Sequence, residues 1–200
     1  MLLIVGGHSR NVGKTAVAAG IIAALPKARW TAMKITQTGH GICSQDGEPC
    51  HCGTDYEHPF AIVEEREASQ TDSGRFLAAG ARRAYWVRTA AGQLPNALPG
   101  IRSILDKGGN IIVESNSLLN YIVPDIYLVV LDFAVADMKA SARRFLTRAD
   151  AFVASNSNLP NPWGVPERWL HGVNRFETAP PQWVSADCAR FVADRMKRLR

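Results

Sequence analysis

The chain begins with the stretch Met1-Leu2-Leu3-Ile4-Val5-Gly6-Gly7-His8-Ser9-Arg10-Asn11-Val12-Gly13-Lys14-Thr15. Residues 1–5 are apolar, and an apolar, alanine-rich run continues from Ala16 to Leu25. This order indicates a buried strand, a tight turn and a helix, which is the context that a phosphate-binding P-loop requires. In such a loop, backbone N–H groups surround a phosphate, and the helix N-terminus adds about half a positive charge.

The loop supplies the predicted nucleotide ligands. We expect Lys14 to reach the outer phosphates and the Thr15 hydroxyl to bind Mg²⁺. The usual pattern has Gly where this chain has His8, and Gly7 precedes it, so the loop is one residue longer. A chance Gly-Lys-Thr on a surface turn is the alternative. The predicted nucleotide-binding residues are Gly7, Ser9, Arg10, Asn11, Val12, Gly13, Lys14, Thr15 and Ala16.

The run 7–15 resembles the phosphate loop of dethiobiotin synthetase, which is also longer by one residue and ends in Val-Gly-Lys-Thr. The wider group includes molybdopterin-guanine dinucleotide biosynthesis protein B and metal-centre maturation NTPases. Several members are dimers with nucleotide near the interface, so the resemblance implies a homodimer. Arg10 is unusual in this loop. It either caps a solvated turn or contributes charge to a phosphate, within one chain or across a dimer.

Two further segments carry the resemblance. Residues 34–39, at the end of a predicted strand over 30–36, are similar to the Lys-Pro-x-x-x-Gly stretch of dethiobiotin synthetase, with Ile35 in place of Pro. This implies that Lys34 lies at the phosphate and substrate side; a snorkelling lysine is the alternative. Residues 71–81 resemble the stretch of the molybdopterin protein in which an Asp heads a helix near Mg²⁺. Asp72 is therefore a candidate metal ligand or activating group, or only a helix cap.

A third acid stands at the tip of a predicted strand over 110–117. An apolar strand that ends in a carboxylate is the partner a P-loop needs, because Mg²⁺ prefers hard oxygen ligands. Glu114 matches the Glu of the Val-Glu-Gly found in dethiobiotin synthetase, while Ser115 replaces the Gly. The catalytic candidates are Lys14, Lys34, Asp72 and Glu114. The predicted magnesium ligands are Thr15, Asp72 and Glu114.

The residues after a predicted strand over 149–155 bear on the base of the nucleotide. Guanine-selective relatives carry Asn-Lys-x-Asp there, whereas this chain has Asn156-Ser157-Asn158. This difference favours ATP over GTP, since the Asn156 amide can offer both a donor and an acceptor to adenine. An ordinary turn is the alternative interpretation.

A cysteine-rich loop is expected at about 39–59, because the segment is polar and turn-rich and has no periodicity. Cys43, Cys50 and Cys52 are thiolate candidates for Zn²⁺ or an iron–sulfur centre, with His40 or His51 as a fourth ligand. Their spacing is not that of a standard zinc finger. An exposed loop with reactive thiols and no metal is an equally supported alternative.

Composition narrows the class of protein. The 200 residues and net charge of +5 fit a single domain of about 1–200, with a helix at about 185–199. No long basic stripe with interleaved aromatics suggests nucleic-acid binding, and no apolar run suggests a membrane span or signal peptide. We therefore expect a cytoplasmic protein. Four cysteines in a reducing compartment favour metal or redox chemistry, or plain core residues, over disulfides.

Strands alternate with helices, which predicts an α/β fold: a mainly parallel sheet with helices on both faces, as in three-layer P-loop NTPases. Further strands are expected at 84–89 and 126–132, and helical segments at 64–67, 100–107 and 136–147. Three functions remain open: an NTP-hydrolysing accessory factor for a cofactor or metal centre, a dethiobiotin-synthetase-like ligase acting on a small molecule, and a non-enzymatic metal-binding module. The partner is a nucleotide plus an unknown substrate or client protein.

Overall fold

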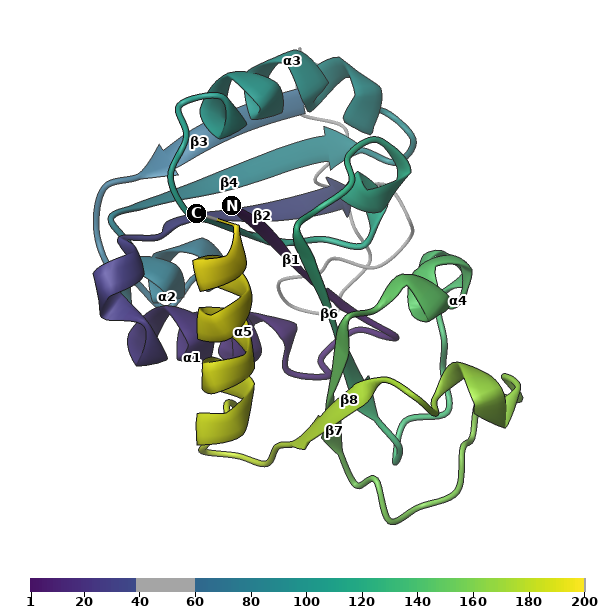
Figure 1. The fold of residues 1–200 in the computed structure, drawn as a ribbon. Helices are drawn as coiled ribbons and strands as arrows, with labels where there is room; N and C mark the ends of the chain where they lie inside the picture. The colour runs from purple at the N-terminus through teal and green to yellow at the C-terminus, as the bar shows by residue number, and fades with distance from the viewer. Residues whose placement is uncertain (39–59, 200) are drawn as a thin grey trace.

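A computed structural model describes residues 1–38 and 60–199. They form an eight-stranded sheet with the order β3-β4-β2-β5-β1-β6-β7-β8 (Figure 1). The strands are β1 (Leu2–Gly7), β2 (Thr31–Thr38), β3 (Phe60–Glu65), β4 (Arg83–Ala90), β5 (Ile111–Glu114), β6 (Ile126–Asp132), β7 (Ala151–Ser155) and β8 (Asn174–Glu177). Neighbouring strands are parallel except for β3, which pairs with β4 in antiparallel fashion.

Helices cover both faces of this sheet. The helices are α1 (Lys14–Ala24), α2 (Asp72–Ala78), α3 (Leu94–Leu105), α4 (Ala140–Phe145) and α5 (Ala186–Arg198), with short 3₁₀ turns η1 (Pro26–Ala28), η2 (Ser117–Asn120), η3 (Leu146–Arg148) and η4 (Glu167–Trp169). Side chains of α1, α2 and α5 pack in one hydrophobic cluster, and those of α3 and α4 in a second. The sheet lies between these two layers, so the predicted three-layer α/β fold is confirmed.

The central strands are apolar on both sides because both faces are covered. Along β6, Leu128 and Val130 face the α1 layer, while Tyr127 and Val129 face the α3 layer. All four side chains are almost completely buried. Burying a large aliphatic side chain contributes about 1.5–3 kcal/mol to stability. The centre of the sheet is thus a rigid base for the loops at its carboxyl end.

Glu64 and Glu65 are not helical, so the prediction of a helical face at 64–67 was wrong. Both residues belong to β3, where Glu64 pairs with Tyr85 and forms an ion pair with Arg83 at 3.0 Å. The acidic residues of this segment suggested a solvated helix. The segment is instead an edge strand, because it pairs with β4 and because Ile62 packs beside Gly100 of α3.

The helix predicted at 100–107 begins earlier, at Leu94. Pro95 lies in its first turn, where a backbone N–H has no partner to lose. Pro99 removes one hydrogen bond inside the helix, but the buried face of Leu94, Ala97 and Ile101 holds the helix on the sheet. In place of the helix predicted at 136–147, the structure has the shorter helix α4 followed by the turn η3. The edge strand β8 was not predicted, because its side chains show no apolar alternation.

Candidate functional site

The loop between β1 and α1 lies at the carboxyl end of the sheet. Gly7 donates its N–H to Asn116 Oδ1 at 2.9 Å and accepts from Asn116 Nδ2 at 2.8 Å, so a residue just beyond β5 fixes the start of the loop. Asn11 (φ 54°) and Gly13 (φ 92°) are left-handed. A Cβ at Gly13 would meet the Trp183 ring 2.3 Å away, which explains why a glycine stands there. The loop therefore turns tightly into the N-terminus of α1, a geometry suited to an anion.

Lys14 is the first residue of α1 and folds back over the loop. Its ammonium donates to the carbonyl of Ser9 at 2.6 Å. Burial is the main cause that lowers the pKa of Lys14 to about 8, because the charged form loses water. A desolvated lysine ammonium beside this loop is one that an anionic phosphate would stabilise strongly.

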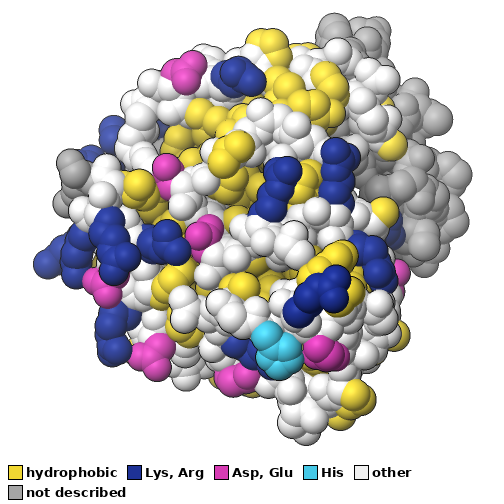
Figure 2. All heavy atoms as spheres, turned by 45° about the vertical axis from the view of Figure 1, so that its right-hand side comes forward, with side chains coloured by type: hydrophobic (Ala, Val, Ile, Leu, Met, Phe, Trp, Pro, Cys, Tyr) yellow, Lys and Arg dark blue, Asp and Glu magenta, His cyan; other side chains and the backbone are white. Residues whose placement is uncertain are grey.

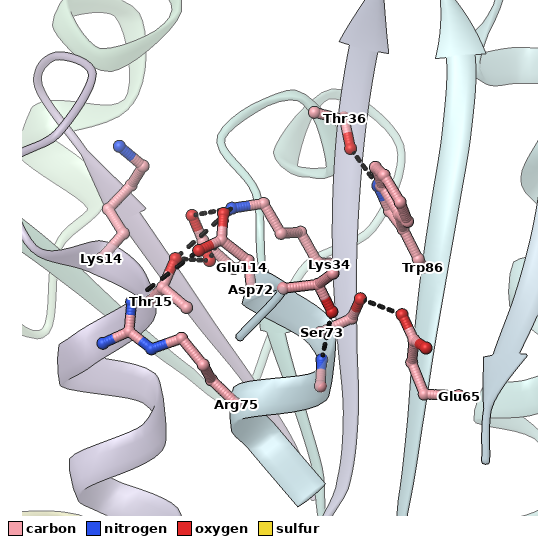
Figure 3. Close-up of polar contacts among 12 residues, drawn as sticks. Lys14, Thr15, Lys34, Thr36, Glu65, Asp72, Ser73, Arg75, Trp86 and Glu114 are labelled. Atoms are coloured by element: carbon pink, nitrogen blue, oxygen red, sulfur yellow. Dashed lines mark hydrogen bonds and ion pairs between the residues drawn. The ribbon is translucent and has the colours of Figure 1, made fainter. Parts of the chain in front are cut away.

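The next residue, Thr15, belongs to a polar group that we call the acidic cluster: Thr15, Lys34, Asp72 and Glu114. Thr15 Oγ1 donates to Glu114 Oε2 at 2.7 Å, and both residues are buried. The Lys34 ammonium contacts Asp72 and lies 3.3 Å from both Thr15 Oγ1 and Glu114 Oε1. Figure 3 shows the four side chains converging, while the Lys14 ammonium points away from them.

Strand register explains this convergence. Glu114 of β5 pairs with Val5 of β1 and with Lys34 of β2, so these residues point to the same face of the sheet. A hydroxyl and two carboxylates then surround one positive charge. Hard oxygen donors around a cation are the chemistry that Mg²⁺ prefers, so the donor set fits this metal.

Asp72 is available to this cluster because another residue caps its helix. Thr71 is the N-cap of α2, and its side chain accepts from the N–H of Gly74 at 3.1 Å. The interpretation of Asp72 as a mere helix cap was therefore wrong. Asp72 instead occupies the first turn, where the helix dipole favours a carboxylate, and Arg75 lies 3.9 Å from it.

His8 has a role that sequence reasoning missed. The backbone N–H of Asp132 donates to His8 Nε2 at 3.0 Å, and since an N–H can only donate, the ring proton resides on Nδ1. Nδ1 then donates to the carbonyl of Asp137 at 2.8 Å. The ring is fully buried, and burial lowers its pKa. The only sign of these His8 contacts in the sequence was a bulky residue at a position where P-loops usually have glycine.

Asn156 follows β7 and lies at the same end of the sheet. It is left-handed (φ 53°), and its side-chain amide donates to Asp132 Oδ1 at 2.8 Å. Among residues 1–38 and 60–199, no group donates a hydrogen bond to the side-chain oxygen of Asn156. The role of Asn156 in reading a base stays a prediction.

Cys43, Cys50 and Cys52 lie outside the described residues, as do His40 and His51. Within residues 1–38 and 60–199, no group of three or more His, Cys, Asp or Glu side chains is arranged to hold a metal ion by protein ligands alone. The fourth cysteine, Cys188, is buried in α5, and burial raises its pKa to about 11, as expected of an inert core thiol.

Positive charge outside the site is dispersed. On the face seen in Figure 2, lysine and arginine side chains are scattered and interspersed with acidic ones. In the part of the chain that the structure describes, no helix is both long and apolar enough to cross a bilayer.

Comparison with known proteins gives similarity at the level of the fold. No protein-family model and no curated protein matched the chain. A structure of HypB from Helicobacter pylori in complex with nickel is 12% identical, and the match covers 99% of this chain and 88% of HypB with a TM-score of 0.51. A structure of the "apo" form of LpxK from Aquifex aeolicus in complex with ATP is 15% identical, with 88% of this chain and 53% of LpxK covered and a TM-score of 0.47.

The chain thus spans about half of the LpxK chain that it matches. Together with the sheet order, the similarity to HypB supports an α/β fold with a mainly parallel sheet. The narrower resemblance to dethiobiotin synthetase and the molybdopterin protein is not confirmed by these structures.

Proposed function

We propose that this protein is a Mg²⁺-dependent nucleoside-triphosphate-binding and hydrolysing protein, with ATP favoured over GTP, that acts as an accessory factor in cofactor or metal-centre biosynthesis. The observation that carries the proposal is the convergence of Thr15, Asp72 and Glu114 around the Lys34 ammonium beside the loop. These are the groups a P-loop protein needs for a metal and a phosphate chain.

In this proposal, each residue of the site has a separate role. Amides of the loop and the N-terminus of α1 hold the phosphates, and Lys14 neutralises charge on the outermost one. Thr15, Asp72 and Glu114 would hold Mg²⁺, which supplies positive charge next to the phosphates. Lys34, which contacts these oxygens, would interact with the transferring group once Mg²⁺ is bound. Catalysis by this arrangement is mostly orientation and electrostatic stabilisation.

The accessory role rests on the cysteine-rich loop, whose thiols are suited to Zn²⁺ or an iron–sulfur centre or to contact with a client protein. The nickel in the HypB structure belongs to HypB, and it makes metal handling a compatible use of this fold. A cytoplasmic homodimer is part of the same proposal. The second candidate is a small-molecule ligase, favoured by the contact of Lys34 with Asp72, although Lys34 lies in the middle of β2 and not at its end as predicted.

Turnover and metal content separate these functions. We expect anaerobically purified protein to release phosphate from MgATP faster than from MgGTP and to contain zinc or iron. Glu114→Gln should lose turnover, whereas Lys107→Ala, an exposed change after α3, should keep it. Metal without turnover would support a binding module. Turnover stimulated by a small molecule, without metal, would support the ligase. Wild-type protein with neither nucleotide binding nor turnover would refute the proposal.

A further inference from the structure

The segment that follows β6, residues 132–139, is docked on the phosphate loop. Besides the two His8 ring contacts, the Ser9 hydroxyl donates to Asp137 Oδ2 at 2.5 Å. The N–H of Lys139 donates to the carbonyl of His8 at 2.8 Å. The backbone of Lys139 is therefore held in a fixed position beside the first residues of the loop.

An aromatic contact supports the same docking. The Trp163 ring packs against His8 and Phe133, each with a centroid distance of 4.8 Å. Its indole N–H donates to the carbonyl of Val135 at 2.8 Å. The segment is thus held near its start by Trp163 and at its end by His8. Such support fixes the backbone from which the side chain of Lys139 extends.

The side chain of Lys139 belongs to what we call the basic cluster: Arg10, Lys14 and Lys139. Burial is the main cause that lowers the pKa of Lys139, and the neighbouring charge of Arg10 lowers it further. Lys139 is in turn one of the charges that lower the pKa of Lys14. The three cations therefore share one region of the loop.

The nearby acids are engaged elsewhere. Asp137 accepts from Ser9, and Glu114 accepts from Thr15 and Lys34. Within residues 1–38 and 60–199, no member of the basic cluster forms an ion pair with a carboxylate. Half-buried cations that lie close together without ion-pair partners repel one another in the free protein, although Glu114 and Asp137 offset part of this repulsion. Their natural complement is a multiply charged anion.

We propose that Lys139 is a second phosphate-binding lysine, which contacts the terminal phosphate of a nucleoside triphosphate beside Lys14. This inference rests on the proposed function. Lys139 is anchored at His8, where the loop begins, and its charge interacts with Glu114 and Lys34 of the acidic cluster. Because the acidic cluster borders Thr15, we expect the ammonium of Lys139 to reach the end of the phosphate chain that a diphosphate lacks.

The test compares triphosphate with diphosphate binding. Titration calorimetry with Mg²⁺ would use ADP, GDP and non-hydrolysable analogues of ATP and GTP on wild-type protein, Lys139→Met and Lys27→Met. Lys27 is exposed on η1, beyond the far end of α1, so its substitution removes the same charge away from the loop. We expect Lys139→Met to weaken triphosphate binding about tenfold and diphosphate binding less than about twofold. Lys27→Met should change neither.

Two further results complete the design. Lys139→Arg, which keeps the charge, should retain most of the triphosphate preference. Should Lys139→Met not fold in thermal denaturation, Lys139→Gln carries the same comparison. An unchanged preference, or equal weakening for both classes of nucleotide, overturns the inference while the proposed function stands. Wild-type protein that binds no nucleotide overturns both.

Discussion

The acidic cluster and the basic cluster lie on either side of the same loop, yet their charges are balanced differently. In the acidic cluster, Asp72 and Glu114 surround the single ammonium of Lys34. In the basic cluster, Arg10, Lys14 and Lys139 have no carboxylate partner among residues 1–38 and 60–199. The first arrangement is organised around a cation, and the second is complementary to an anion. Together they match the two charges of a metal–nucleotide complex.

The largest expected effect comes from removing the central charge of the basic cluster. Lys14→Ala should lower phosphate release from MgATP by at least about 100-fold, because a preorganised positive charge on the outer phosphate is lost. The measurement is steady-state phosphate release, with Lys27→Met as the control. Near-normal turnover in Lys14→Ala would refute the assignment of the loop and with it the contrast between the clusters.

The substitution of His8 removes the ring contacts that dock residues 132–139, and with them Lys139, on the loop. His8→Ala should lower the free energy of unfolding by about 2–4 kcal/mol, because it opens a cavity and leaves the N–H of Asp132 and the carbonyl of Asp137 without their partners. Urea denaturation measures this loss. The exposed His171→Ala should stay within about 0.5 kcal/mol of wild type. Equal stability of both variants would show that the docking of residues 132–139 does not depend on His8.

These effects involve residues that the sequence identified to different degrees. Strand, loop and helix follow one another locally over residues 1–25, so the β1–loop–α1 unit was predictable, and Thr15, Lys34, Asp72 and Glu114 do lie together. His8 contacts Asp132 and Asp137, which are 124 and 129 residues away in the chain. No local pattern contains such contacts. For the same reason β3 could not be recognised, since its pairing with β4 decides its conformation.

A smaller effect is expected when the acidic cluster loses its cation. Lys34→Met leaves Asp72 and Glu114 facing each other without compensation, which should lower the unfolding free energy by about 1–3 kcal/mol in the absence of divalent ions. Millimolar Mg²⁺ should then raise the melting temperature of Lys34→Met more than that of wild type, since the ion replaces the ammonium.

Thermal denaturation with and without Mg²⁺, in the absence of nucleotide, measures this difference. Lys34→Arg, which keeps a positive charge, is the matched control and should respond to Mg²⁺ as wild type does. The same small Mg²⁺ response in wild type and Lys34→Met would contradict the view that the acidic cluster is a cation site.

The smallest effect concerns the protonation of His8. Burial holds the pKa of His8 below its usual value of 6.5, so the unfolded chain binds a proton near pH 6.5 while the native protein does not. The unfolding free energy should therefore fall as the pH drops below about 6.5, and this loss ends once the pH lies below the native pKa. Protonation would also place a donor opposite the N–H of Asp132 and a positive charge near Lys14.

Urea denaturation at several pH values between about 5 and 8 measures this change. Other titrating groups contribute as well, but they are shared by wild type and His8→Ala, so the difference in stability between these two proteins isolates His8. That difference should shrink as the pH falls below about 6.5. A difference that is constant with pH would mean that His8 is as easily protonated in the native protein as in the unfolded chain. Such a result would mean that neither burial nor the charge of Lys14, one member of the basic cluster, disfavours the protonated ring.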